Sequence, residues 1–148
     1  MKTFKGRIVT PGTVTAEALV SHVGFNTLAS FQKSLQFGGK KVIVNDQNNA
    51  DLYGKEIGGK ALCLPQTIGS TTGGLVLYCA CKMKKNPACM LFSNKIDSLA
   101  CAGAVLADVW ADEVTMPVID SLGDAFLKYV KDGQKITVKE NGVVVVED

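Results

Sequence analysis

The sequence predicts one domain of the mixed α/β class, with helices packed against mixed sheets. Two runs in the middle, Ala61–Leu64 and residues 88–92, are entirely apolar, which is typical of strands buried on both faces. Segments with apolar residues at helical spacing alternate with these runs, and the β-branched end of the chain contains an Asn-Gly turn at residues 140–142. A chain of 148 residues can bury one core and is short for two, so we expect a single domain over residues 1–148.

The first half is expected to contain three strands and one helix. The expected strands are residues 6–9, 18–20 and 41–44. Between residues 25 and 37, apolar side chains recur at steps of three and four, which predicts a helix that ends at Gly38-Gly39. Residues 45–51 are too rich in Asn and Asp for a regular element and are predicted to be a loop.

The second half is expected to alternate between strands and helices before a final hairpin. The expected strands are residues 61–64, 88–92, 134–138 and 143–146, and the expected helices are residues 75–83, 98–109 and 122–131. Asn86-Pro87 ends the first of these helices, because proline disfavours helical backbone in the residue before it. Asp97 or Ser98 is the expected cap of the second helix.

The composition excludes several classes of protein. Lys and Arg total 16 against 14 Asp and Glu, and a net charge of +2 is too small for a nucleic-acid-binding surface. The first residues lack an apolar signal segment, and no run approaches the ~20 apolar residues of a membrane span, so we expect no membrane binding and a cytoplasmic location. The five cysteines lie in apolar stretches, which favours reduced, buried thiols over disulfides.

The segment from Pro65 to Gly74 has the pattern of a strand end, a tight turn and a helix start. Ser70, Thr71 and Thr72 follow Gly69 in this turn. Backbone N–H groups at a helix start lack partners within the helix and lie at the positive end of its dipole, so they favour an anion or an ionised side chain. Ser70 is therefore either a helix cap with no further role or a catalytic residue, and the decapeptide alone leaves both open.

Other motifs give weaker indications. Residues 54–60 space Gly, Gly and Lys as in a nucleotide-binding P-loop. The next residue, Ala61, lacks the hydroxyl that binds magnesium, and a strand follows where a P-loop needs a helix, so we expect a polar turn. Cys79 and Cys81 point to different faces of a helix, and His22 is the only histidine, so no metal site is expected in this chain. His22 is either a plain loop residue or a substrate contact. The Asn-rich loop either caps its own turns or lines a binding cleft.

Several of these motifs occur in the order typical of one family. Residues 62–65 lead into the turn at residues 68–74, and they are followed by Asn-Pro-Ala-Cys at 86–89 and Ala-Gly-Ala-Val at 102–105. With residues 6–9 and 59–62, this series resembles the aconitase X family, specifically its swivel-domain or small subunit. The resemblance implies a swivelling β/β/α domain and an enzyme that eliminates water from a small hydroxylated carboxylic acid.

The resemblance also implies roles for individual residues. Ser70 corresponds to the serine that removes the proton next to a carboxylate, with Gly69, Thr71 and Thr72 as contacts of the substrate or of the alkoxide. Further expected substrate-binding residues are His22, Asn26, Asp46, Asn48 and Asn49. The N–H groups of Thr71, Thr72 and Gly73 are candidates to stabilise the Ser70 alkoxide. Aconitases continue this turn with a second serine and an arginine, whereas Thr71 and Thr72 stand here.

The resemblance further implies a partner and a cofactor. No credible iron–sulfur ligand set is present in the sequence, so iron or an iron–sulfur cluster is expected on a larger catalytic subunit, with this chain as the small subunit of a heterodimer. Residues 19–32 look more like the bacterial cis-3-hydroxy-L-proline dehydratase group, and phosphomevalonate dehydratase is the alternative activity. A module of another class, which binds an anion or regulates without catalysis, is the competing hypothesis.

Overall fold

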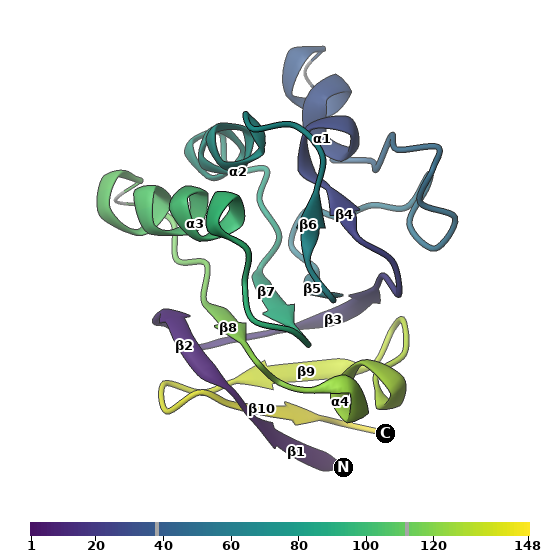
Figure 1. Ribbon diagram of the computed structural model, residues 1–148, viewed down its shortest axis with the longest axis vertical. Helices are drawn as coiled ribbons and strands as arrows, with labels where there is room; N and C mark the ends of the chain where they lie inside the picture. The colour runs from purple at the N-terminus through teal and green to yellow at the C-terminus, as the bar shows by residue number, and fades with distance from the viewer. Residues whose placement is uncertain (38, 112) are drawn as a thin grey trace.

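A computed structural model describes residues 1–37, 39–111 and 113–148 of the chain. Three layers are seen in Figure 1: helices α1 to α3 at the top, a layer of strands below them, and a second layer of strands at the bottom. The predicted mixed α/β class and the β/β/α arrangement are therefore confirmed.

Four parallel strands form the middle layer. In spatial order they are β3 (Val14–Val20), β5 (Ala61–Leu64), β7 (Cys89–Phe92) and β8 (Val118–Asp120). Each connection between neighbours carries one helix, namely α1 (Thr27–Gln36), α2 (Gly73–Lys82) and α3 (Ser98–Trp110). All three helices cover the same face of the sheet (Figure 1). The loops that follow β3, β5 and β7 consequently leave the sheet at one edge.

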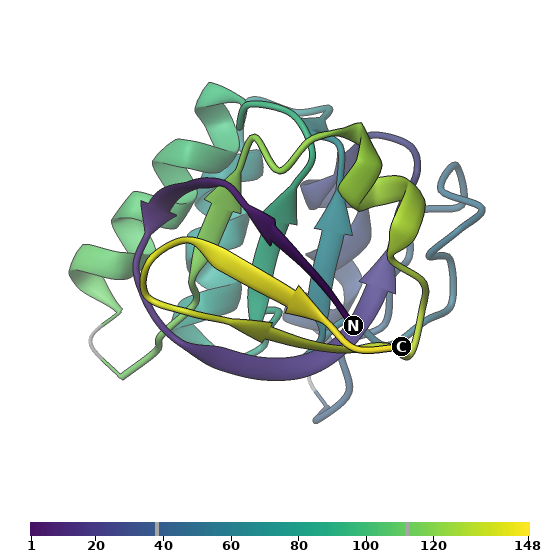
Figure 2. The same ribbon diagram turned by 90° about the horizontal axis from the view of Figure 1, so that it is seen from below.

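Four further strands belong to the same eight-stranded sheet, which turns over to form the bottom layer. They are β1 (Lys2–Lys5), β2 (Arg7–Thr10), β9 (Lys135–Val138) and β10 (Val143–Val146). The spatial order is β1-β10-β9-β3-β5-β7-β8-β2, so consecutive strands β1 and β2 stand at opposite ends of the sheet. Gly6, which joins them, donates a hydrogen bond to Gly142 O at 3.1 Å. Seen from below, the hairpin of β9 and β10 crosses in front of the parallel strands (Figure 2).

Two hydrophobic cores separate the layers. Along β5, Leu62 and Leu64 face the helices, while Ala61 and Cys63 face the second strand layer, and all four side chains are fully buried. Strand β7 alternates in the same way. The short helix α4 (Asp124–Tyr129) adds Phe126 to the lower core. Burial on both faces explains why these strands are apolar throughout.

The predicted elements agree with the structure over most of the chain, with several corrections. Residues 41–44 are not a strand: Val42 and Val44 are buried, but the segment makes only the isolated bridge between Ile43 and Glu56. The helix expected from residue 25 begins at Thr27, because the two preceding residues form a short strand. Four strands are missing from the prediction, namely Lys2–Lys5 (β1), Phe25–Asn26 (β4), Thr67–Ile68 (β6) and Val118–Asp120 (β8). Gly38, half of the expected helix stop, lies outside the described residues.

Among the helices that the structure describes, none has both the length and the apolar character needed to cross a bilayer.

Candidate active site

Three segments from distant parts of the sequence meet at one edge of the parallel sheet. They follow β3, β5 and β7, and parallel neighbours bring their carboxyl ends together. Beyond this edge the first two segments pair again, because β4 (Phe25–Asn26) lies parallel to β6 (Thr67–Ile68). The turn that contains Ser70 follows β6 and therefore lies beside the end of β4.

Ser70 lies in this turn and is half-buried, whereas Thr71 and Thr72 are exposed. Its Oγ is 2.8 Å from Thr72 Oγ1 and accepts a hydrogen bond from the Thr72 N–H at 3.2 Å. Thr72 is the N-cap residue of α2 by position, but its backbone is helical and its side chain makes no capping bond. Ser70 Oγ instead accepts the N–H two residues further on, which is the bond that a capping serine makes, so the geometry fits a capping role and a catalytic role alike.

The backbone N–H groups of the turn divide between two oxygens of Ser70. The Thr72 N–H reaches the hydroxyl, as the sequence suggested, but the Gly73 N–H donates to the Ser70 carbonyl oxygen at 3.0 Å. A donor to the hydroxyl oxygen stabilises the alkoxide more than the alcohol, because the acceptor becomes charged. The start of α2 adds its positive dipole end in the same direction.

Gly69 allows Asn26 to lie directly against the turn. Its φ of +98° is a conformation that residues with a Cβ rarely adopt, and a Cβ here would be 2.6 Å from Asn26 Nδ2. Asn26 is also the N-cap residue of α1, and its Oδ1 accepts from the Ala29 N–H at 3.1 Å. The starts of α1 and α2 are therefore neighbours, and both favour negative charge at this position.

The other side of the turn is pressed against α3. A Cβ on Gly74 would be 2.5 Å from Leu99 O, and a Cβ on Gly103 would be 2.4 Å from Gly74 O. Only glycine at both positions permits this close approach of the two helix backbones. It fixes the first turn of α2, and with it the N–H groups near Ser70, relative to α3.

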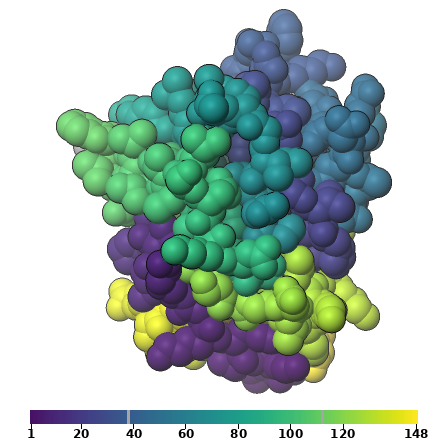
Figure 3. All heavy atoms as spheres, viewed as in Figure 1, coloured from purple at the N-terminus to yellow at the C-terminus, as the bar shows by residue number. Residues whose placement is uncertain are grey.

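Asp97 joins this region although the sequence indicated it only as a possible cap of α3. It is that cap, and it also accepts hydrogen bonds from the N–H and the hydroxyl of Thr67 in β6. On the face shown in Figure 3, teal atoms of the middle of the chain lie beside green atoms of the segment around α3. The missed signal is that residues 93–97 follow a buried parallel strand, as residues 65–72 do.

His22 lies apart from Ser70. It precedes β4, whereas Ser70 follows the carboxyl end of β6, so the two residues stand at opposite ends of this parallel pair. His22 pairs with Asp51, whose Oδ2 is 3.3 Å from Nδ1 and accepts from the His22 N–H at 2.8 Å. Both line a surface pocket of ≈ 560 Å³ together with Lys128 and Lys131. His22 therefore lies outside the serine turn, and its role as a substrate contact stays a prediction.

The Asn-rich loop uses its polar atoms mainly to hold its own shape. Asp46 Oδ1 accepts from the Asn48 N–H at 3.0 Å, and Asn49 Oδ1 accepts from the Leu52 N–H at 3.2 Å. Asn49 is 1% exposed and donates to Ser21 Oγ at 3.0 Å, while Asp46 is also buried. Asn48 is exposed. Roles of Asp46, Asn48 and Asn49 in substrate binding stay predictions, whereas Asn26 is placed at the turn.

Iron or an iron–sulfur cluster has no fitting ligand set in the part of the chain that the structure describes. No three side chains of His, Cys, Asp or Glu gather there into a metal-binding group. Burial raises the pKa of Cys81 and of Cys89 to about 12, and it raises that of Cys63 well above its usual value. Burial in apolar surroundings therefore keeps these free thiols protonated at neutral pH.

The β/β/α layers and the serine turn at the start of α2 define a swivel-type domain with an anion-favouring edge. A family model described as the aconitase X swivel domain matches residues 3–146, so the chain belongs to the aconitase X swivel domain family. The family resemblance seen in the sequence is thereby confirmed.

Curated relatives and a solved structure agree with this assignment. The chain is 30% identical to the phosphomevalonate dehydratase small subunit of Thermococcus onnurineus, over 98% of both chains. It is 31% identical to the small subunit of the same name from Methanocella arvoryzae, over 91% of both chains. The crystal structure of aconitase X from Thermococcus kodakaraensis, in its holo-form, matches over 100% of both chains with a TM-score of 0.81 and 26% identity.

These relatives confirm the prediction of a dehydratase, a lyase, built from two subunits. Their names correspond to the alternative activity of the sequence analysis, phosphomevalonate dehydratase, and not to its first choice, the hydroxyproline enzyme.

Proposed function

We propose that this chain is the small subunit of a hydro-lyase that dehydrates a small hydroxy acid, with Ser70 as the base. The observation that carries the proposal is the position of the Ser70 hydroxyl. It lies before the start of α2, accepts the Thr72 N–H, and has Asn26 and the start of α1 beside it. Such a place favours an alkoxide and a carboxylate substrate together.

The reaction assigned to this site is an elimination. Ser70 Oγ takes the proton from the carbon next to the carboxylate, and the electron pair of that C–H bond forms the new double bond. The neighbouring C–O bond breaks, and its hydroxide leaves with the bonding pair. It becomes water by taking up from solvent a proton equivalent to the one that the Ser70 hydroxyl gave to solvent when its alkoxide formed. Thr72 stabilises the charge on Ser70 through its N–H, and the exposed hydroxyls of Thr71 and Thr72 are proposed substrate contacts.

A larger catalytic subunit is the proposed partner. The name small subunit, carried by the relatives, supports a two-chain enzyme. The described residues of this chain offer the base and helix starts but no cluster of metal ligands. We therefore assign the iron or iron–sulfur centre, which would help the hydroxyl to leave, to the larger subunit.

Phosphomevalonate is the substrate that the curated relatives favour. cis-3-Hydroxy-L-proline is the second candidate, and the resemblance of residues 19–32 to the hydroxyproline group supports it. Both are small hydroxy acids and both suit the same base. The relatives named as dehydratase subunits count against a module that only binds an anion or regulates.

The test is turnover by the complex of both subunits. The chain is co-expressed with its larger subunit, and each candidate acid is incubated with the complex while the dehydrated product is followed by mass spectrometry. We expect one acid to be dehydrated and the Ser70→Ala complex to be inactive. Thr13→Ala removes an exposed hydroxyl before the amino end of β3, at the opposite edge of the sheet, and should leave turnover unchanged. Activity retained by Ser70→Ala would refute the assignment.

A further inference from the structure

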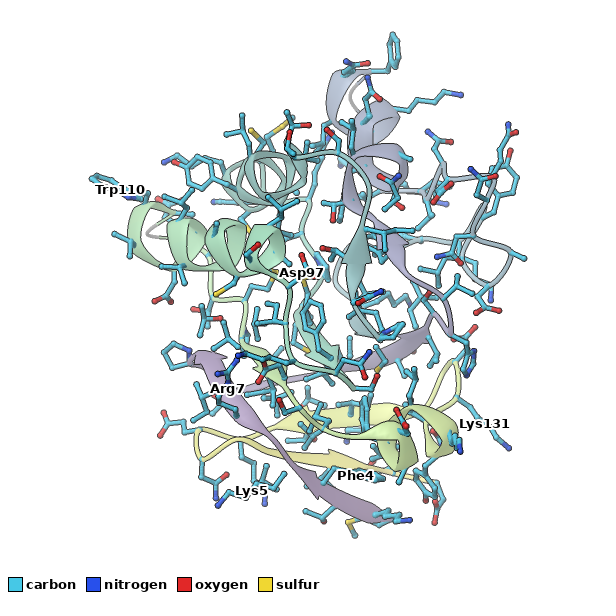
Figure 4. All side chains as sticks on the ribbon, in the orientation of Figure 1. Phe4, Lys5, Arg7, Asp97, Trp110 and Lys131 are labelled. Carbon is cyan, nitrogen blue, oxygen red and sulfur yellow. The ribbon has the colours of Figure 1, made fainter. Side chains whose placement is uncertain are left out.

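A single carboxylate connects the serine turn to α3. Asp97 Oδ2 accepts from the Ala100 N–H at 3.1 Å, which is the capping bond of the helix. The same side chain accepts from the Thr67 N–H at 2.9 Å and from the Thr67 hydroxyl at 2.6 Å. Figure 4 shows Asp97 at the start of α3. Capping needs only the first of these bonds, so the two bonds to β6 call for another explanation.

Asp97 is itself held in place through the residue before it. The Ile96 N–H donates to Asp120 Oδ2 at 2.8 Å, and the buried Asp120 carboxylate also accepts two hydrogen bonds from Arg7, at 2.9 and 2.6 Å. Burial alone would raise the pKa of Asp120, but the bonds from Arg7 and Ile96 hold it below its usual value. Asp120 thus stays ionised and fixes the segment that presents Asp97.

The turn is therefore attached to α3 on both sides of Ser70. Thr67, three residues before Ser70, is bound by Asp97, and Gly74, four residues after it, packs against Gly103. Between these two attachments only a short turn remains, so the position of the hydroxyl depends on both of them. A base must be held within a fraction of an ångström of its productive place.

We propose that Asp97 is a positioning residue for Ser70, acting through its two hydrogen bonds to Thr67. The proposal rests on the proposed function of Ser70 as the base. Asp97 does not touch the substrate in this arrangement: it fixes the strand that leads into the turn, and the turn then presents the hydroxyl oxygen.

Two variants separate this role from helix capping. Asp97→Ser keeps a good cap for Ala100, because serine and aspartate cap about equally well, but its shorter side chain cannot reach Thr67. Thr67→Val removes only the hydroxyl and preserves the shape of the side chain. Both are made in the complex with the larger subunit, and kcat and KM are measured with whichever acid the wild-type complex dehydrates.

For Asp97→Ser we expect kcat to fall about 10- to 100-fold while KM changes by less than about twofold, because a displacement of ~1 Å affects proton transfer far more than binding. Thr67→Val should lower kcat less. The double variant should be no slower than Asp97→Ser alone, since both changes remove the same link.

Val144→Ala serves as the control for stability. Val144 is buried in the lower core, on a strand outside the parallel layer, and its truncation should lower the melting temperature with kcat unchanged. A wild-type kcat in Asp97→Ser would overturn the proposal. An equal loss of kcat in Val144→Ala at the same melting temperature would also overturn it. If Asp97→Ser does not fold, Thr67→Val decides: an unchanged kcat overturns the proposal, and a several-fold loss supports it.

Failure of the proposed function gives a different result. In that case Ser70→Ala retains the wild-type rate, or the wild-type complex dehydrates neither acid. A failure of the positioning role alone leaves Ser70→Ala inactive and Asp97→Ser fully active.

Discussion

Gly69→Ala should destabilise the chain through two separate effects at the serine turn. The φ of +98° is strained for any residue with a Cβ, at about 1–2 kcal/mol. The new methyl group would also be 2.6 Å from Asn26 Nδ2, so the Asn26 side chain must move and α1 loses a cap bond worth about 1 kcal/mol. We expect a total loss of about 2–3 kcal/mol, which corresponds to a fall in melting temperature of about 4–12 °C for a chain of this size.

The assay is urea unfolding of the purified chain followed by circular dichroism, with one control and one double variant. Gly133→Ala tests the backbone effect alone, since Gly133 has a φ of +87° and its added Cβ meets nothing within 4 Å. Asn26→Ser keeps a capping oxygen but shortens the side chain. In this background Gly69→Ala should lower the free energy of unfolding only by the cost of the backbone strain. The contact between the turn and the cap would be refuted if Gly69→Ala and Gly133→Ala lowered the free energy of unfolding equally. It would also be refuted if the effect of Gly69→Ala were the same with Asn26 present and in the Asn26→Ser background.

Three further predictions concern single groups. Ser70→Ala should abolish turnover and lower the free energy of unfolding by only about 1 kcal/mol, because its hydroxyl accepts a single cap-type bond from the Thr72 N–H. A much larger loss in chemical unfolding would contradict this. Asp120→Asn should cost about 1–3 kcal/mol at pH 7 by weakening the bonds from Arg7 and Ile96. The pKa of Asp120 in the folded chain lies below its unfolded value of about 3.9, so its contribution to stability is present above that pH and is lost as pH falls through the folded pKa. The difference in free energy of unfolding between wild type and Asp120→Asn should therefore become smaller in unfolding curves measured in acid. Maleimide should label the two partly exposed thiols of the native chain and spare the three buried thiols, whereas all five should be labelled in urea. Labelling of a buried thiol without urea would contradict its assignment to the core. The partly exposed thiols are Cys79 and Cys101, and the buried ones are Cys63, Cys81 and Cys89.

The elements with strong local signals were predictable from the sequence. The β5 run Ala61–Leu64 is apolar throughout and is bounded by polar turns, and it was found with its observed ends. The hairpin of β9 and β10 was found from its Asn-Gly turn, and the cap at Asp97 from its residue type. In each case the deciding interaction lies within a few residues along the chain.

The errors arise where distant contacts decide the local structure. Residues 41–44 contain three consecutive β-branched residues, which favour a strand, and Val42 and Val44 are indeed buried. Their backbone bonds, however, go to an irregular partner: the Val44 N–H donates to Lys55 O, and Val42 O accepts from the Ile57 N–H. Residues of this type indicate burial and do not guarantee a regular ladder. Phe25 fits the helical pattern, but its pairing with Thr67 in β6 delays the helix to Thr27.

The candidate site shows the same division between local and distant information. Ser70 and its flanking glycines could be recognised in one decapeptide, because a strand end, a turn and a helix start are encoded locally. Asn26 lies 44 residues before Ser70 and Asp97 lies 27 residues after it, and only the order β3-β5-β7 brings them to the same edge. That order follows from pairing between buried strands, whose apolar side chains carry little information about which strand is the neighbour. Once the parallel order is known, the segment after each of these strands becomes a candidate for the site, and Asp97 is the first residue such a search would add to the serine turn.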